Sequence, residues 1–174
     1  MTVVTRRHLS TTRTGQVSLS FAGMNDALRP FVTAIDHVGV AVPDLDEAIA
    51  YYRDTFGLEV AHVEVNEEQG VHEAMVRAPG DDGAGTAVQL LAPLRPDSTI
   101  GKFLDSKGPG LQQLAYRVSD LDAVSEALRA KGLRLLYPEP KRGTADSRVN
   151  FVHPKDAGGV LVELVEPAAA PHPS

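Results

Sequence analysis

An internal duplication constrains the fold of this chain more than any other feature. Residues 35–60 (IDHVGVAVPDLDEAIAYYRDTFGLEV) align over residues 111–136 (LQQLAYRVSDLDAVSEALRAKGLRLL). Five residues recur identically in the ungapped block: Val42, Asp44, Leu45, Asp46 and Arg53 return as Val118, Asp120, Leu121, Asp122 and Arg129. After a gap of one residue, Gly57-Leu58 matches Gly132-Leu133. A repeat of this length predicts two structural units of the same kind.

Each copy carries the same pattern of elements. It begins with a strand-like run, 35–42 or 111–118, and continues with a helix whose N-cap is Asp44 or Asp120. Gly57 and Gly132 stand where a left-handed cap would end that helix. Three more strand-like segments follow in each copy: 58–65, 72–78 and 86–92 in the first, and 133–137, 148–153 and 159–166 in the second. The pattern therefore predicts an α+β fold of two tandem βαβββ modules.

This pattern also predicts how the chain is divided. We expect a flexible N-terminal extension (1–32), a first module (33–93), a linker (94–109) with a short helix around 100–106, a second module (110–167) and a disordered tail (168–174). The first 23 residues contain three arginines, many Ser and Thr and no acidic residue, as organellar transit peptides do. We favour a disordered extension, or translation from Met24, and hence a cytoplasmic protein. Organellar targeting is the alternative.

Composition excludes several classes of function. The net charge is −6 and the body of the chain has no basic run, which argues against nucleic-acid binding. No apolar run approaches the ~20 residues that span a bilayer, so we expect no membrane partner. Cysteine is absent, which excludes a disulfide framework, a thiol nucleophile and a thiolate metal site. Any metal must be held by imidazole, carboxylate or amide ligands.

Four polar residues interrupt apolar strands at equivalent positions of the two copies. His37 and Gln113 lie in the first strands, and Gln89 and Glu163 lie in the last strands. Taken singly, such a residue is usually solvent-facing or satisfied by a hydrogen bond. At symmetry-related positions of a repeat, all four are expected to face one shared cleft.

Two tandem βαβββ modules resemble the vicinal oxygen chelate superfamily, whose members include glyoxalases, extradiol dioxygenases, epimerases and fosfomycin-resistance proteins. The resemblance covers about residues 34–167 and implies a cleft with a metal held by His37, Gln89, Gln113 and Glu163. Such an oxygen-rich set favours Co²⁺ or Mn²⁺, with Ni²⁺ or Mg²⁺ as alternatives, over tetrahedral Zn²⁺. Gln113 is a departure, because epimerases commonly read GLHH or GIHH where this chain reads GLQQ. The departure implies weaker metal binding, and it argues against extradiol dioxygenases, which need two histidines.

Four segments narrow the resemblance to the methylmalonyl-CoA epimerase family: NEEQGVHEAMV (66–76), QLLAPL (89–94), LLYPEPKRGT (135–144) and NFVHPKDAGGVLVELVEP (150–167). It implies metal-dependent epimerisation of (2R)- and (2S)-methylmalonyl-CoA, by removal and return of the C2 proton through a metal-bound enolate. The two bases it implies are Glu73 and Glu163. Without the resemblance, Glu73 would be interpreted as a solvated strand residue paired with Arg77.

Cations near the predicted cleft are candidates for substrate binding. Lys141 and Arg148 flank a Gly-Thr turn, and either could meet the substrate carboxylate or the CoA phosphates. An equal alternative is that they are ordinary surface cations. Asn150, in the strand that follows, is a further candidate.

Two other functions remain open on the same fold. A glyoxalase I-like isomerase would usually carry a glutamate where this chain has Gln89. A metal-free ligand-sequestering protein, like the bleomycin-resistance proteins, would have no use for the four-residue constellation. We also expect a homodimer, because paired modules leave sheet edges and helix faces to cover.

Overall fold

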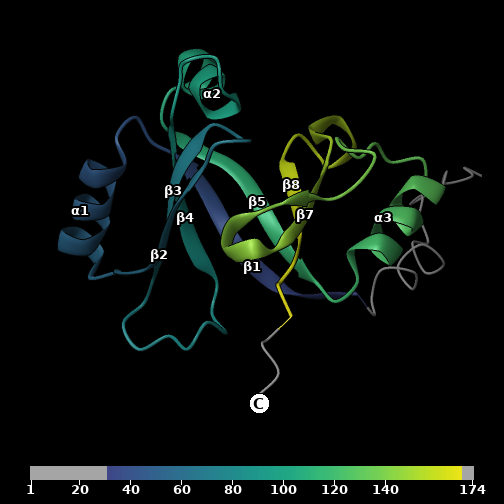
Figure 1. The fold of residues 1–174 in the computed structure, drawn as a ribbon, viewed down its shortest axis with the longest axis horizontal. Coiled ribbons are helices and arrows are strands. Elements are labelled where there is room, and N and C mark those ends of the chain that lie inside the picture. Colours follow the sequence, from purple (N-terminus) through teal and green to yellow (C-terminus); the bar gives the residue numbers. More distant parts are fainter. Residues whose placement is uncertain (1–30, 170–174) are drawn as a thin grey trace, which may run out of the picture.

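The computed structural model describes residues 31–169, so the predicted N-terminal extension and C-terminal tail lie almost wholly outside it. The first module consists of β1 (Val32–Ala41), α1 (Leu45–Phe56), β2 (Glu59–Asn66), β3 (Val71–Arg77) and β4 (Ala87–Pro93). A connecting helix α2 (Thr99–Lys107) leads to β5 (Gly110–Val118), α3 (Leu121–Ala130), β6 (Lys141–Arg142), β7 (Arg148–Val152) and β8 (Leu161–Glu166). Two short 3₁₀ turns, η1 (Thr144–Asp146) and η2 (Pro154–Asp156), flank β7 (Figure 1).

The eight strands form one sheet whose order repeats the duplication. The order is β2-β3-β4-β1-β5-β8-β7-β6, so each strand of one module has a counterpart at the mirrored place in the other. Strand β1 pairs in parallel with β4 and antiparallel with β5, and β5 pairs in parallel with β8. The two modules therefore meet along the β1–β5 seam, and the predicted tandem βαβββ architecture is confirmed.

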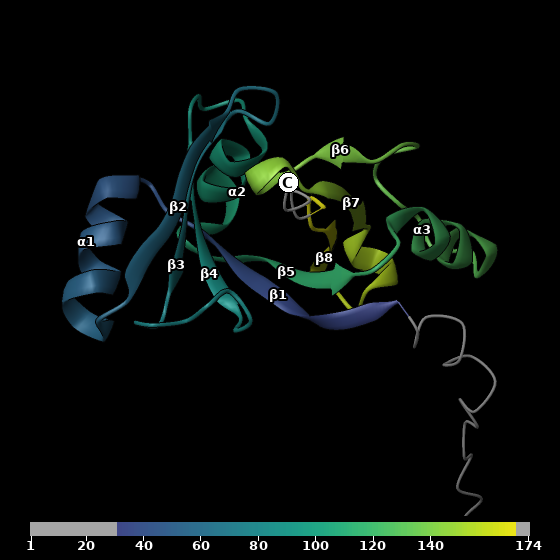
Figure 2. The same ribbon diagram turned by 60° about the horizontal axis from the view of Figure 1, so that its bottom comes forward.

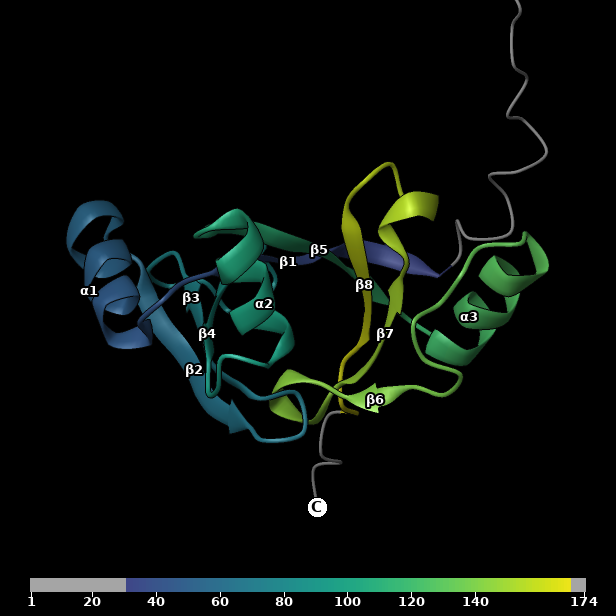
Figure 3. The same ribbon diagram turned by 90° about the horizontal axis from the view of Figure 1, so that it is seen from above.

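The sheet is strongly curved, with α1 and α3 on its outer side and α2 packed against Val71 and Leu91 on the concave side. Figure 3 shows β1 and β5 together on one side and β2 and β6 brought toward each other on the opposite side, while α1 and α3 lie at the two flanks. Figure 2 shows the same arrangement from an intermediate direction. Two ion pairs join the ends of the sheet, Lys141 to Glu68 and Arg142 to Glu64. The concave face is thereby partly enclosed.

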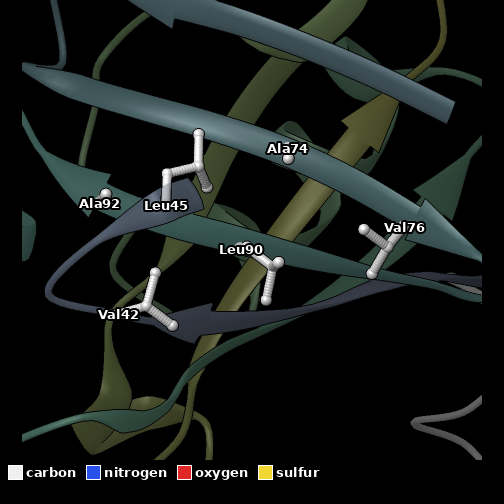
Figure 4. Packing of buried hydrophobic residues seen from close by; sticks show 6 residues of the cluster. All are labelled: Val42, Leu45, Ala74, Val76, Leu90 and Ala92. Carbon is white, nitrogen blue, oxygen red and sulfur yellow. The ribbon is translucent and has the colours of Figure 1, made fainter. Parts of the chain in front are cut away.

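Alternation along the strands sorts residues between the two faces. On β4, Leu90 is fully buried in the cluster that packs against α1, whereas its neighbours Gln89 and Leu91 line a cavity on the concave face. Figure 4 shows that cluster, which consists of Val42, Leu45, Ala74, Val76, Leu90 and Ala92. Burying a side chain as large as Leu90 stabilises the fold by roughly 1.5–3 kcal/mol. An equivalent cluster beneath α3 contains Val118, Leu121, Val124, Leu128, Val152 and Leu164.

The predicted helix boundaries are confirmed at both copies. The side chains of Asp44 and Asp120 accept hydrogen bonds of 2.9 Å from the backbone N–H groups of Glu47 and Ala123. Gly57 and Gly132 adopt the left-handed conformation, with φ of 69° and 81°. In the described part, no helix is long and apolar enough to span a membrane.

One predicted strand is wrong. Residues 133–137 form no strand and only an isolated bridge between Leu135 and Val152, and the strand that edges the second module is β6 at 141–142. Pro138 and Pro140 follow directly, and proline has no N–H to donate to a ladder. The chain therefore touches β7 only at the Leu135 bridge and joins the sheet at β6.

Candidate active site

The four side chains from equivalent positions of the repeat converge on the concave face. The amide nitrogen Nε2 of Gln113 donates to Glu163 Oε2 at 2.5 Å and to Gln89 Oε1 at 3.2 Å, and lies 3.4 Å from Nε2 of His37. Nε2 of His37 lies 3.0 Å from the same Glu163 oxygen. All four residues are buried. The structure therefore brings together one imidazole, one carboxylate and two amides, drawn from both modules.

Two backbone features set the position of Gln113. Gly39 lies opposite it on β1, and a Cβ built on Gly39 would stand 2.5 Å from Cγ of Gln113. The register of β1 and β5 shifts next to this pair, where Gly39 pairs with Gln113 but Val40 pairs with Leu111. Gln112 is thus the extra residue of a β-bulge, and both Gln112 and Gln113 line the cavity.

A second carboxylate faces the same cavity from β3. Glu73 is 4% exposed and accepts hydrogen bonds from Gln89 Nε2 at 2.9 Å and from Thr144 Oγ1 at 2.6 Å. The Thr144 hydroxyl in turn accepts from Gln89 Nε2 at 2.9 Å. A chain of contacts therefore runs from Glu73 through Gln89 and Gln113 to Glu163.

Burial and neighbouring charges shift the pKa values of the site. Burial raises the pKa of Glu73 to about 7, although the hydrogen bond from Thr144 opposes the shift. Burial lowers the pKa of His37, but the carboxylates of Asp36 and Glu163 outweigh it and raise this pKa to about 9. The pKa of the Glu73 carboxyl therefore lies close to ordinary physiological pH, as proton transfer requires.

Behind the imidazole, a polar pair fixes the orientation of the ring. Nδ1 of His37 lies 2.9 Å from Asp36, and Asp36 accepts a 2.7 Å hydrogen bond from Nε of Arg117. Metal-binding histidines commonly use such a carboxylate to hold the ring nitrogen that does not face the metal. The arrangement leaves Nε2 directed at Glu163.

The donor set fits a divalent cation. The Nε2 atoms of His37 and Gln113 both direct positive character at Oε2 of Glu163, which is where a cation would supply its charge. Turning over the Gln113 amide would exchange nitrogen for oxygen at almost unchanged shape. Within residues 31–169, no group of three His, Cys, Asp or Glu side chains could hold a metal, so the set depends on its two amides.

Of the two cations predicted to bind substrate, the structure places one at the cavity and one away from it. Lys141 lines the cavity, which has a volume of about 410 Å³, and its Nζ pairs with Glu68 at 2.8 Å. Arg148 pairs instead with Asp122 and Glu166 and does not line the cavity.

The side chain of Asn150 also lies away from the cavity. It is fully buried, accepts from the backbone N–H of Tyr137 at 3.2 Å and donates to the Tyr137 carbonyl at 3.0 Å. Its amide groups hold the segment around Tyr137, and the structure gives Asn150 a role in the fold.

Several cavity residues were not predicted from the sequence, among them Thr144, Gln112 and Arg95. Thr144 lies on an irregular segment followed by two non-glycine residues with positive φ, Ala145 (53°) and Asp146 (60°), which has no periodic signal. The Gly-Thr turn was the one available sign of it. Arg95 stacks over Gly70, where a Cβ would come within 2.8 Å of the guanidinium.

Comparison with known proteins is consistent with this geometry. A sequence profile of the glyoxalase/bleomycin resistance protein/dioxygenase superfamily matches residues 36–151. The mitochondrial methylmalonyl-CoA epimerase of Mus musculus is 40% identical over 131 residues, covering 75% of this chain and 71% of the relative. The ethylmalonyl-CoA/methylmalonyl-CoA epimerase of Cereibacter sphaeroides is 40% identical over 133 residues, covering 75% and 95%. The chain belongs to the methylmalonyl-CoA epimerase family.

Solved structures of the epimerase family share the fold. The methylmalonyl-CoA epimerase of Mycobacterium tuberculosis is 57% identical with a TM-score of 0.75, covering 79% of this chain and 90% of that one. A methylmalonyl-CoA epimerase in complex with methylmalonyl-CoA and NH₄⁺ is 49% identical with a TM-score of 0.76, covering 82% and 99%. By family, this chain is therefore an enzyme of the isomerase class.

Proposed function

We propose that this chain epimerises (2R)- and (2S)-methylmalonyl-CoA at C2 with Glu73 and Glu163 as two bases. The observation that carries the proposal is that two buried carboxylates, one from each module, line one cavity and are joined through Gln89 and Gln113. Inverting a carbon requires a proton to leave from one side of a planar intermediate and to arrive on the other. Two carboxylates that approach from different strands meet this need.

Each base has a distinct setting. Glu73 is held by hydrogen bonds from the neutral side chains of Thr144 and Gln89, and burial brings its pKa to about 7, where it can both gain and lose a proton. Glu163 is bound to His37 and Gln113. We infer that one epimer loses its C2 proton to Glu73 and the other loses it to Glu163.

A divalent metal would be held by His37, Gln89, Gln113 and Glu163. The two amide oxygens are hard neutral donors, which favours Co²⁺ or Mn²⁺, with Ni²⁺ or Mg²⁺ as alternatives. When bound, such a cation would polarise the thioester carbonyl and make the C2 proton more acidic. Asp36 and Arg117 would keep the imidazole in place.

The CoA part of the bound substrate would extend out of the cavity beside the cationic side chains at its wall. Lys141 and Arg95 both line the cavity and are about half exposed, at 45% and 47%. Exposed cations of this kind suit the phosphates of CoA. Relatives named for methylmalonyl-CoA and ethylmalonyl-CoA support this class of substrate.

The alternatives on this fold are less well supported. A probable lactoylglutathione lyase of Vibrio parahaemolyticus is 25% identical, against 40% for the two epimerases. A metal-free sequestering protein would not need four polar residues buried around one point at the floor of the cavity.

We further propose that the protein is a cytoplasmic homodimer. Large apolar side chains remain exposed on α1 and on the edge strand β2, among them Tyr51 (56%), Phe56 (59%) and Val63 (46%). An uncovered edge strand beside exposed aromatic rings is a surface that a second copy could cover. Sedimentation equilibrium would measure the mass, and a monomer at micromolar concentration would contradict the dimer. Because relatives from mouse and human are named mitochondrial, microscopy of the tagged full-length chain is the test of its location.

The decisive experiment follows the C2 proton directly. Proton NMR in deuterated water should show loss of the C2 signal from methylmalonyl-CoA with the enzyme present, and a chelator should stop this loss. Absence of exchange from both epimers, with metal supplied, would overturn the proposed function.

A further inference from the structure

Glu64 is a carboxylate that lies beside Glu73 but outside the cavity. The two residues pair directly across β2 and β3, so their side chains point to the same face of the sheet. Glu64 is not among the described residues that line the cavity, and its side chain is only 13% exposed. Because like charges directly opposite each other destabilise a sheet, Glu64 is expected to have partners that compensate for its charge.

Three nitrogen groups surround the Glu64 carboxylate, and two of them come from the second module. The backbone N–H of Ala145 donates to Oε2 at 2.9 Å, and Nε2 of His62 lies 2.6 Å from the same oxygen. The guanidinium of Arg142 donates to Oε1 at 3.4 Å. Burial raises the pKa of Glu64, but these three partners outweigh burial and hold the pKa below its usual value. Glu64 is therefore an ionised acceptor that binds the backbone of the other module.

The backbone segment that Glu64 binds has an unfavourable conformation. Ala145 and Asp146 have φ of 53° and 60°, in the left-handed region that residues other than glycine rarely adopt. Such a conformation persists only where surrounding contacts hold it. The hydrogen bond from Ala145 to Glu64 is a contact of this kind. The residue directly before these two is Thr144.

The turn at 144–146 places the Thr144 hydroxyl on Glu73. This hydroxyl donates to Oε1 of Glu73 at 2.6 Å, and the next residue, Ala145, donates to Glu64. Two adjacent residues of the second module are thus bound by two neighbouring carboxylates of the first. A turn released from Glu64 would therefore also withdraw its hydroxyl from Glu73.

We propose that Glu64 is a positioning residue for epimerisation, which holds the turn at 144–146 through the N–H of Ala145 and so keeps the Thr144 hydroxyl on Glu73. This inference rests on the proposed function, in which Glu73 is a base, and deepens it. Glu64 acts through Thr144 and does not touch the substrate. Its loss should therefore change the rate of the chemical step more than the binding of substrate.

Two substitutions of Glu64 separate its hydrogen bond from its charge. Glu64→Met keeps the length of the side chain and removes both oxygens. We expect kcat for methylmalonyl-CoA to fall about five- to tenfold in the full-length Glu64→Met protein, as for loss of one positioning hydrogen bond, with KM changed less than about twofold. Glu64→Gln removes the same charge but keeps an oxygen that can accept from Ala145, so its kcat should stay within about twofold of the parent value.

The same substitution in a second background shows whether Glu64 acts through Thr144. When Thr144 is already valine, Glu64→Met should lower kcat by less than about twofold further, because the hydroxyl that it positions is absent. Arg142→Met is the matched control, since it removes an ion pair of Glu64 but leaves the bond from Ala145, and it should keep the parent kcat. If Glu64→Met does not fold, Glu64→Asp tests the same bond, because it keeps the charge but shortens the reach of the carboxylate.

A measurement without substrate separates this inference from the proposed function. The methyl resonance of ¹³C-labelled Thr144, identified by its loss in Thr144→Val, should move in Glu64→Met and Glu64→Asp and stay in place in Glu64→Gln. The inference is overturned if Glu64→Met keeps the parent kcat or the parent Thr144 resonance, if Glu64→Gln loses as much activity, or if the loss is undiminished in the Thr144→Val background. A parent chain that exchanges no C2 proton would contradict the epimerase function alone, because the Thr144 resonance still reports whether Glu64 holds the turn.

Discussion

The hydroxyl of Thr144 donates a 2.6 Å hydrogen bond to Oε1 of Glu73, across the cavity from one module to the other. Thr144 belongs to the turn between β6 and β7, and Glu73 belongs to β3. The position of a carboxylate in the first module is therefore fixed by a residue of the second. The same hydroxyl accepts from Gln89, so it also ties Glu73 to the network around Glu163.

Replacing Thr144 by valine should slow epimerisation about tenfold, because Glu73 would lose its positioning hydrogen bond. That bond lowers the pKa of Glu73 against the effect of burial, so its loss should raise this pKa. Glu73 must be ionised to accept a proton. As the pH is lowered, activity should therefore begin to fall at a higher pH in Thr144→Val than in the parent. Rate measurements from pH 5.5 to 9 check the shift. Thr144→Ser keeps the hydroxyl and should retain the parent profile; an unshifted profile in Thr144→Val would exclude the positioning role.

Removal of metal should abolish exchange of the C2 proton. We expect added Co²⁺ or Mn²⁺ to restore the rate better than Zn²⁺, because two of the four proposed ligands are neutral amide oxygens. The measurement is the rate of epimerisation after dialysis against a chelator, with metal content determined on the same samples. Full activity at less than one metal per hundred chains would rule out a metal-dependent mechanism.

The substitution Gln113→His should tighten metal binding, since imidazole is a better donor to transition metals than an amide. Titration with Co²⁺ by absorbance gives the affinity. Gly39→Ala is the contrasting change, because its Cβ would stand 2.5 Å from Cγ of Gln113 and displace that side chain. Gly39→Ala should weaken Co²⁺ binding although the four proposed ligand residues stay the same. Equal affinity in all three proteins would mean that Gln113 is not a ligand.

The variants Glu73→Gln and Glu163→Gln should lose activity for different reasons. Glu163→Gln removes the only carboxylate of the ligand set, so metal content and turnover should fall together. Glu73→Gln should keep metal and lower turnover by about 10²- to 10⁴-fold, as expected for loss of a general base. One epimer should still exchange its C2 proton through Glu163 without inverting. Proton NMR in deuterated water, with each epimer supplied separately, checks this; equal loss of exchange from both epimers would refute the two-base assignment.

Substitutions of Asn150 and Arg148 should change the stability of the protein to different extents, and neither should change substrate binding. Asn150→Leu leaves the backbone N–H of Tyr137 without its partner and removes one of the two donors to the Tyr137 carbonyl, which also accepts from Arg129. This should cost about 1–3 kcal/mol of unfolding free energy. Arg148 pairs with Asp122 at the surface, so Arg148→Ala should cost about 1 kcal/mol or less. Urea unfolding measures both. A tenfold change in KM for methylmalonyl-CoA in Arg148→Ala would indicate that Arg148 does bind the substrate.

The duplication allowed much of this structure to be predicted, because caps and strand periodicity are local properties. Asp44 and Asp120 begin helices, and the strands around His37 and Gln113 pair across the seam as the repeat requires. The failures lie where the chain leaves its regular elements. Residues 133–137 have the composition of a strand, but the two prolines that follow divert them. Thr144 reaches the site from a turn with left-handed residues, and Arg148 forms an ion pair with Asp122 on α3. Neither feature can be predicted from the pattern of the sequence alone.

The seam between β1 and β5 has an evolutionary consequence. Two separate copies of one module, paired along that seam, would be obliged to present identical side chains on both sides of their axis. Covalent linkage of the copies removes that obligation. It allows a histidine of one copy to correspond to a glutamine of the other, and a glutamine to correspond to a glutamate, as His37 corresponds to Gln113 and Gln89 to Glu163. A substrate without two-fold symmetry is matched better by a site that also lacks it, and fusion of the halves made each half free to diverge.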